Sequence, residues 1–87
     1  MYQVELLPEA INDLQRLDKP VAQRILNKLR WLAENFESVR PETLVGPLAE
    51  LAKLRVGDYR VIYEPDRENR LITVHLLGHR REIYRQS

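Results

Sequence analysis

A Gly57-Asp58 pair lies between two runs of alternating apolar and polar side chains, and this arrangement constrains the fold more than any other feature of the chain. Such a pair predicts a β-hairpin with a two-residue turn and strands over 49–56 and 59–64. The turn also sets the register, because residues equally distant from it must face each other. The resulting apolar face pairs Val56 with Tyr59, Leu54 with Val61, and Ala52 with Tyr63.

The other face of this hairpin carries three cations, Lys53, Arg55 and Arg60. In this register Arg55 lies opposite Arg60, while Lys53 lies opposite Ile62. Directly opposed like charges destabilise a sheet, and the three cations have no acidic cross-strand partner, Glu64 being the nearest acid on that face. We therefore expect a phosphate-bearing ligand here. A solvated charged face, common on exposed hairpins, is the alternative.

The remaining pattern predicts an α+β domain of order β-α-α-β-β-β. A strand is expected over 2–7, and Pro8 begins a helix that ends at about Leu17. Asp18 is expected to cap a second helix that reaches about Asn35. Because the break between these helices is short, they should fold back as a helical hairpin against a small, mainly antiparallel four-stranded sheet.

The C-terminal half contains a loop, a central strand and a basic tail. Pro41, Gly46 and Pro47 indicate a loop over 37–48. The nearly continuous apolar run over 71–77 predicts a central strand, which Gly78 should end. A basic tail that includes a tyrosine follows, formed by His79, Arg80, Arg81, Tyr84 and Arg85.

Length and composition narrow the function classes. The 87 residues predict one domain, 1–87, and the absence of cysteine excludes disulfides and thiolate metal sites. No apolar run is long enough for a membrane span, so we expect a soluble cytoplasmic protein. Net charge is only +1, but seven of the eight basic residues in 49–87 are arginines, the side chain best suited to phosphate.

Other chemistry-bearing residues favour no metal or cofactor. His75 and His79 would be about 13 Å apart on a strand, too far for one ion, and His75 fits a packed or surface strand residue. His79, among arginines, is a stronger candidate for function. Trp31 and Phe36 on the second helix fit core or partner-facing positions better than base-stacking ones.

Two motifs together give a resemblance to a known family. The run L-R-V-G-D-Y-R-V-I-Y over 54–63, followed by G-H-R-R-E-I-Y over 78–84, resembles the RelE/ParE superfamily of type II toxin–antitoxin toxins. The segments 8–10 and 17–19 are similar too. The resemblance implies a RelE-like fold and, for the RelE branch, a ribosome-dependent mRNA endonuclease, or mRNA interferase, that a cognate antitoxin neutralises.

The resemblance also implies which residues act. The family's catalytic positions fall on Lys53, Arg60, Arg80 and Tyr84, and further RNA-binding positions fall on Arg55, His79, Arg81 and Arg85. Two features depart from the family: Leu51 stands where well-studied RelE proteins have a second lysine, and Arg80 and Tyr84 are closer together than in those proteins. We also expect the C-terminal helix of many relatives to be missing.

The implied reaction needs no metal or cofactor, because the 2′-OH of RNA is itself the nucleophile. The implied partners are the ribosome, mRNA, and a RelB-like antitoxin that is acidic and wraps the toxin. Two alternatives stay open: a ParE-like DNA gyrase poison without RNase activity, and a catalytically decayed module that binds RNA or antitoxin.

Overall fold

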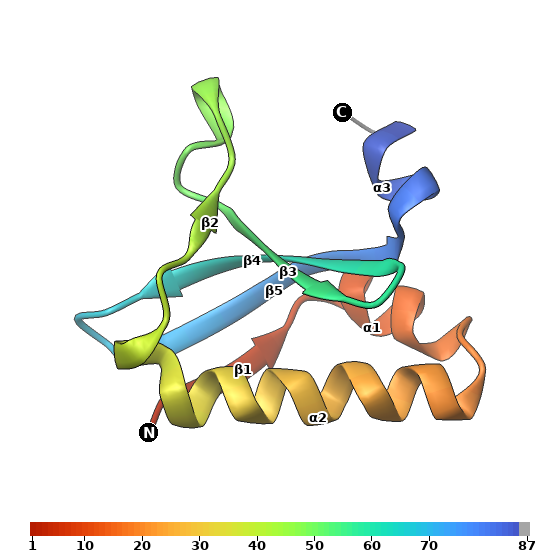
Figure 1. The fold of residues 1–87 in the computed structure, drawn as a ribbon, viewed down its shortest axis with the longest axis horizontal. Coiled ribbons are helices and arrows are strands. Elements are labelled where there is room, and N and C mark those ends of the chain that lie inside the picture. Colours follow the sequence, from red (N-terminus) through yellow and green to blue (C-terminus); the bar gives the residue numbers. More distant parts are fainter. Residues whose placement is uncertain (86–87) are drawn as a thin grey trace.

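The computed structural model describes the backbone of residues 1–85 and the side chains of residues 1–83, and it confirms the α+β class. Figure 1 shows the elements in chain order. They are β1 (Gln3–Leu6), α1 (Pro8–Gln15), α2 (Lys19–Asn35), η1 (Phe36–Ser38), β2 (Glu42–Thr43), η2 (Gly46–Leu48), β3 (Ala52–Val56), β4 (Tyr59–Asp66), β5 (Leu71–His79) and α3 (Arg80–Arg85).

The strands of the described residues form one sheet in the order β1-β5-β4-β3-β2. β1 runs parallel to β5, and the other neighbours are antiparallel. The predicted hairpin register between β3 and β4 is confirmed at every pair, from Ala52 with Tyr63 to Val56 with Tyr59. β5 lies between β1 and β4, as expected for a central strand.

The helical hairpin of α1 and α2 packs on one face of the sheet, and the arm around η2 and the helix α3 rise on the opposite side (Figure 1). The core lies between α2 and the inner strands, because the apolar stripe of the amphipathic helix is buried there. Its largest fully buried side chains are Tyr63, Phe36, Ile25, Leu32, Ile72, Val61 and Val74. None of the described helices has the length and apolarity needed to cross a bilayer.

The structure corrects the sheet's predicted size. We expected four strands and a loop over 37–48, but β2 adds a fifth strand within that loop. Glu42 pairs with Lys53 and Thr43 with Ala52, and the N–H of Leu44 continues the ladder to the carbonyl of Leu51 at 2.9 Å. This strand forms because the outer edge of β3 offers unpaired backbone groups.

The C-terminal prediction was also wrong in two respects. Gly78 lies inside β5 rather than ending it, because β4 continues to pair with Gly78 and His79. A short helix, α3, then replaces the expected tail, and Ile83 from this helix is buried against the sheet. Asp18 stands at the N-cap of α2 as predicted, but its side chain makes no capping hydrogen bond.

Candidate functional site

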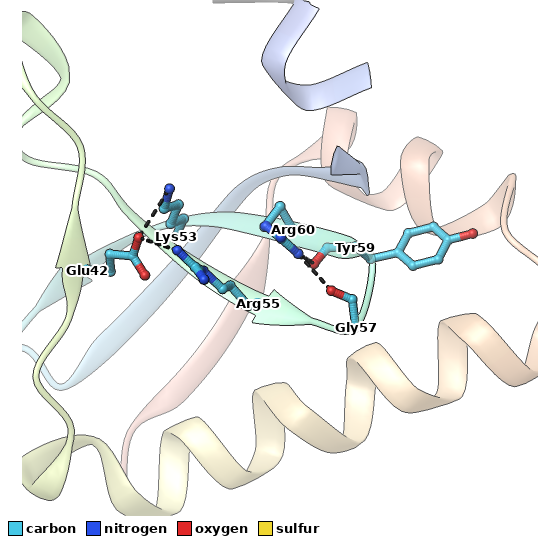
Figure 2. Close-up of polar contacts among 6 residues, drawn as sticks. All are labelled: Glu42, Lys53, Arg55, Gly57, Tyr59 and Arg60. Carbon is cyan, nitrogen blue, oxygen red and sulfur yellow. Dashed lines mark hydrogen bonds and ion pairs between the residues drawn. The ribbon is translucent and has the colours of Figure 1, made fainter. Parts of the chain in front are cut away.

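Lys53 and Arg55 both make ion pairs with one carboxylate, that of Glu42. Lys53 Nζ and Arg55 Nη2 each lie 3.1 Å from Glu42 Oε2 (Figure 2). The prediction that these cations lack an acidic cross-strand partner is therefore wrong, because β2 places Glu42 directly opposite Lys53. Hydrogen bonds from these two cations hold the pKa of Glu42 below its ordinary value, and the bond from Lys53 has the larger effect.

Arg60 is the one buried charged side chain among the described residues, with an exposed fraction of 8%. Its Nη1 donates to the carbonyls of Gly57 at 2.8 Å and Tyr59 at 2.9 Å (Figure 2). Gly57 has a φ of 60°, a conformation that glycine adopts without strain, so the turn can present its carbonyl to Arg60. Within the described structure, the buried Nε of Arg60 finds no acceptor.

The start of α3 lies beside the hairpin turn. The N–H of Arg80 donates to the carbonyl of Asp58 at 2.8 Å, and the His79 ring lies edge-on to Tyr59 with centroids 5.4 Å apart. His79 Nδ1 also accepts a hydrogen bond from the N–H of Arg81. These contacts anchor the first residues of α3 to the hairpin, while the side chains of Arg80 and Arg81 are exposed.

The predicted site residues thus fall into two groups. Lys53 and Arg55 gather around Glu42, whereas Arg60 and the backbone of Arg80 are fixed at the turn end of the hairpin. Lys53 and Arg60 occupy diagonal positions on β3 and β4, which are about 7–8 Å apart in a regular sheet. The predictions for Tyr84 and Arg85 concern side chains outside the described part of the chain.

A further ion pair on the sheet joins His75 and Glu64. Nε2 of His75 lies 3.0 Å from Oε1 of Glu64, so the acid expected nearest to the cations is held by a histidine of β5. His75 is a half-buried strand residue, as predicted. Across residues 1–83, no three His, Asp or Glu side chains converge in a way that could hold a metal ion.

Sequence reasoning missed Glu42, and it gave Trp31 and Phe36 the same interpretation although the structure places the two residues differently. Glu42 belongs to a two-residue strand, which is too short to show alternation, so only the free edge of β3 could have suggested it. Phe36 is buried in the core as predicted, but it follows α2 in η1. Trp31 is 42% exposed and lies near Lys53 and Arg55 in a shared pocket.

The chain matches the family model described as the ParE toxin of the type II toxin-antitoxin system parDE, over residues 4–84. A search among curated proteins found no match.

Solved structures share the fold. A chain of the Mycobacterium tuberculosis toxin–antitoxin complex RelBE2 is 24% identical, with a TM-score of 0.81 over 90% of this chain and 96% of that one. The isolated Escherichia coli RelE toxin is 21% identical, with a TM-score of 0.76, and the match covers 99% of this chain and 94% of that one. A chain of the RelE–RelB complex of Pyrococcus horikoshii OT3 is 27% identical, with a TM-score of 0.67, and the match covers 91% of this chain and 94% of that one.

Proposed function

The chain belongs to the ParE toxin family of type II toxin–antitoxin systems, and from its cationic hairpin we propose that it is a metal-independent endoribonuclease that cuts mRNA in the ribosomal A site. It is a toxin of such a system, and its fold is that of RelE toxins, as the sequence motifs indicated. The finer assignment, to mRNA cleavage on the ribosome, rests on the arrangement of Lys53, Arg60 and Arg80.

The observation that carries the proposal is the buried guanidinium of Arg60. Two backbone carbonyls fix its orientation, and its Nε–H has no acceptor among the described residues. A buried charged side chain with an unsatisfied donor is costly, and charge-assisted hydrogen bonds from this guanidinium to a phosphate would offset that cost. A cation held rigidly before the substrate arrives is what stabilisation of a developing phosphorane charge requires.

The reaction would proceed by attack of the RNA 2′-oxygen on the adjacent phosphorus. The bond from phosphorus to the 5′-oxygen breaks, and the products are a 2′,3′-cyclic phosphate and a 5′-hydroxyl end. The 2′-OH must lose a proton and the leaving oxygen must gain one. We assign charge stabilisation to Arg60 and Arg80, proton transfer or further charge to Lys53, and the base or a stacking role to Tyr84.

The other predicted binding residues would contact the RNA backbone. Arg55, His79, Arg81 and Arg85 flank the proposed catalytic residues on β3, β5 and α3, and phosphate contacts of this kind position RNA without reading its sequence. Because these contacts give little geometric control over one 2′-OH, we propose that the ribosome aligns the message in the cytoplasm, where the toxin would act.

We also propose a RelB-like antitoxin as the partner that neutralises this toxin. Several structurally similar proteins are complexes of RelE with RelB. An acidic, wrapping antitoxin would complement the cationic hairpin and the exposed apolar side chains of the arm, Val45 and Leu48.

A second candidate function is inhibition of DNA gyrase, because the matching family model is named for ParE toxins. Two assays on one preparation separate the candidates: cleavage of a message on programmed ribosomes and supercoiling by gyrase. The proposed function predicts message cleavage and undisturbed supercoiling. Inhibited supercoiling without cleavage would replace it with the second candidate.

A further inference from the structure

A pocket of about 290 Å³ opens beside the Glu42 ion pairs, between α2 and the edge of β3. Its lining includes one exposed aromatic ring and five charged side chains, namely Trp31, Lys28, Arg40, Glu42, Lys53 and Arg55. The pocket is placed here because β2 pairs with β3 only at Ala52 and Lys53. Beyond that pair, α2 runs past a part of β3 that has no described strand on its outer side.

The lining has an unusual charge balance. It contains four cations and a single carboxylate, and that carboxylate, Glu42, is already paired with Lys53 and Arg55. Lys28 and Arg40 add positive charge to the lining. The pocket therefore suits an anionic ligand.

Trp31 adds a flat apolar surface to this cationic lining. The residue is 42% exposed, and the Lys28 ammonium lies 4.1 Å from the centroid of its ring. An aromatic ring flanked by cations is the arrangement that binds single-stranded nucleic acid, since a base stacks on the ring while the cations hold its phosphates. The side chain of Lys28 is long and flexible, so it can leave the ring for a phosphate when a base stacks there.

We propose that this pocket is a nucleotide subsite of the toxin, in which a base of single-stranded RNA stacks on Trp31 and its phosphate binds Arg40 and Lys28. The inference rests on the proposed function and deepens it. The pocket shares Lys53 and Arg55 with the proposed cleavage site, so the bound nucleotide neighbours the one that is cut. An acidic peptide would use the same cations, but it would gain little from a flat aromatic wall.

Trp31 is the only tryptophan of the chain, so its emission reports directly on the pocket. The experiment titrates the full chain with a 2′-O-methyl RNA hexanucleotide, which cannot supply the nucleophile, and records Trp31 fluorescence. The same titration is made with an abasic hexanucleotide of equal charge and with hexaglutamate. Strong quenching by the RNA and weak quenching by both other ligands is expected. Equal quenching by the abasic strand or by hexaglutamate would overturn the inference, as would no quenching by the RNA.

Variants measured by anisotropy of a labelled hexanucleotide complete the test. Trp31→Ala and Arg40→Gln should each weaken binding by about tenfold. Arg30→Gln removes the same charge from an exposed position of α2 that does not line the pocket, and it should change binding by less than twofold. Equal effects of Arg40→Gln and Arg30→Gln would contradict a specific subsite.

The two proposals fail separately. If the wild type cuts A-site mRNA but RNA leaves Trp31 emission unchanged, the subsite is wrong and the proposed function stands. If RNA quenches Trp31 selectively but no message is cut, the subsite stands and the endonuclease assignment is wrong.

Discussion

Arg55 and Arg60 face each other directly across β3 and β4, yet their guanidinium groups are bonded in opposite directions. Arg55 Nη2 donates to Glu42 Oε2, whereas Arg60 Nη1 donates to the carbonyls of Gly57 and Tyr59 (Figure 2). This divergence relieves the repulsion that opposed like charges would otherwise cause. It also divides the hairpin into a carboxylate-linked pair, Lys53 with Arg55, and a single rigid cation, Arg60.

Arg60→Ala should lower the free energy of unfolding by about 1.5–3 kcal/mol, because it removes charged hydrogen bonds to two carbonyls of the hairpin. Urea denaturation at pH 7 measures the effect. Arg55→Ala is the matched control, since its side chain is exposed, and it should change stability by no more than about 0.5 kcal/mol. Equal losses in the two variants would contradict a structural role specific to Arg60.

Gly57→Ala and Gly46→Ala together distinguish the effect of backbone strain on stability from the effect of the Arg60 anchor on cleavage. Both glycines have positive φ, 60° and 67°, so each alanine should cost about 1 kcal/mol in thermal or urea unfolding. Of these two glycines, Gly57 is the one whose carbonyl accepts a hydrogen bond from Arg60. Message cleavage should therefore fall about tenfold or more in Gly57→Ala and stay near wild type in Gly46→Ala. Unchanged cleavage in Gly57→Ala would argue against the anchoring of Arg60.

Glu42→Gln should tighten the binding of an uncleavable 2′-O-methyl RNA by about fivefold, because one negative charge beside the phosphate site is removed. Filter binding or anisotropy at low salt gives the dissociation constants. Glu68→Gln removes the same charge from the exposed turn between β4 and β5 and serves as the control. If the two variants bind RNA alike, Glu42 does not compete with the substrate phosphate.

The ion pairs of Glu42 should also stabilise the fold at neutral pH and lose this effect in acid. Lys53 and Arg55 hold the pKa of Glu42 below its ordinary value of 4.5. The pairs therefore stabilise the fold fully above pH 4.5, and this stabilisation is lost as the pH falls through the lowered pKa. The melting temperatures of wild type and Glu42→Gln should differ at pH 7 and converge in acid. A difference that grows in acid would contradict the assignment.

The register of the β3–β4 hairpin was predictable because it follows from a short turn and a period of two, although β3 begins at Ala52 rather than at residue 49 and β4 continues to Asp66. The two-residue strand β2 was not, since its pairing depends on which edge of β3 is free and not on any local pattern. The helix α3 has only six residues, and it is held by tertiary contacts such as the hydrogen bond from the N–H of Arg80 to the carbonyl of Asp58. Local propensity gave too little signal for either element.

The sequence predicted which cations lie on the hairpin, but it did not predict which partners they contact. Alternation placed Lys53, Arg55 and Arg60 on one face of the hairpin, and it could not show which of them a distant carboxylate would engage. The exposure of Trp31 could have been inferred. It lies one residue before Leu32 of the buried stripe, a rotation of about 100° away from the core.

The proposed endonuclease is tested most directly on programmed ribosomes that carry one defined message, with RNA ends mapped by primer extension. Wild-type toxin should cut in the A site, leave a 2′,3′-cyclic phosphate, and spare both naked RNA and a message with 2′-deoxyribose at the cut nucleotide. Arg80→Ala should reduce the cleavage rate by at least about 100-fold. The absence of A-site cleavage at high toxin concentration, or full cleavage by Arg80→Ala or of the deoxy-substituted message, would contradict the proposed mechanism.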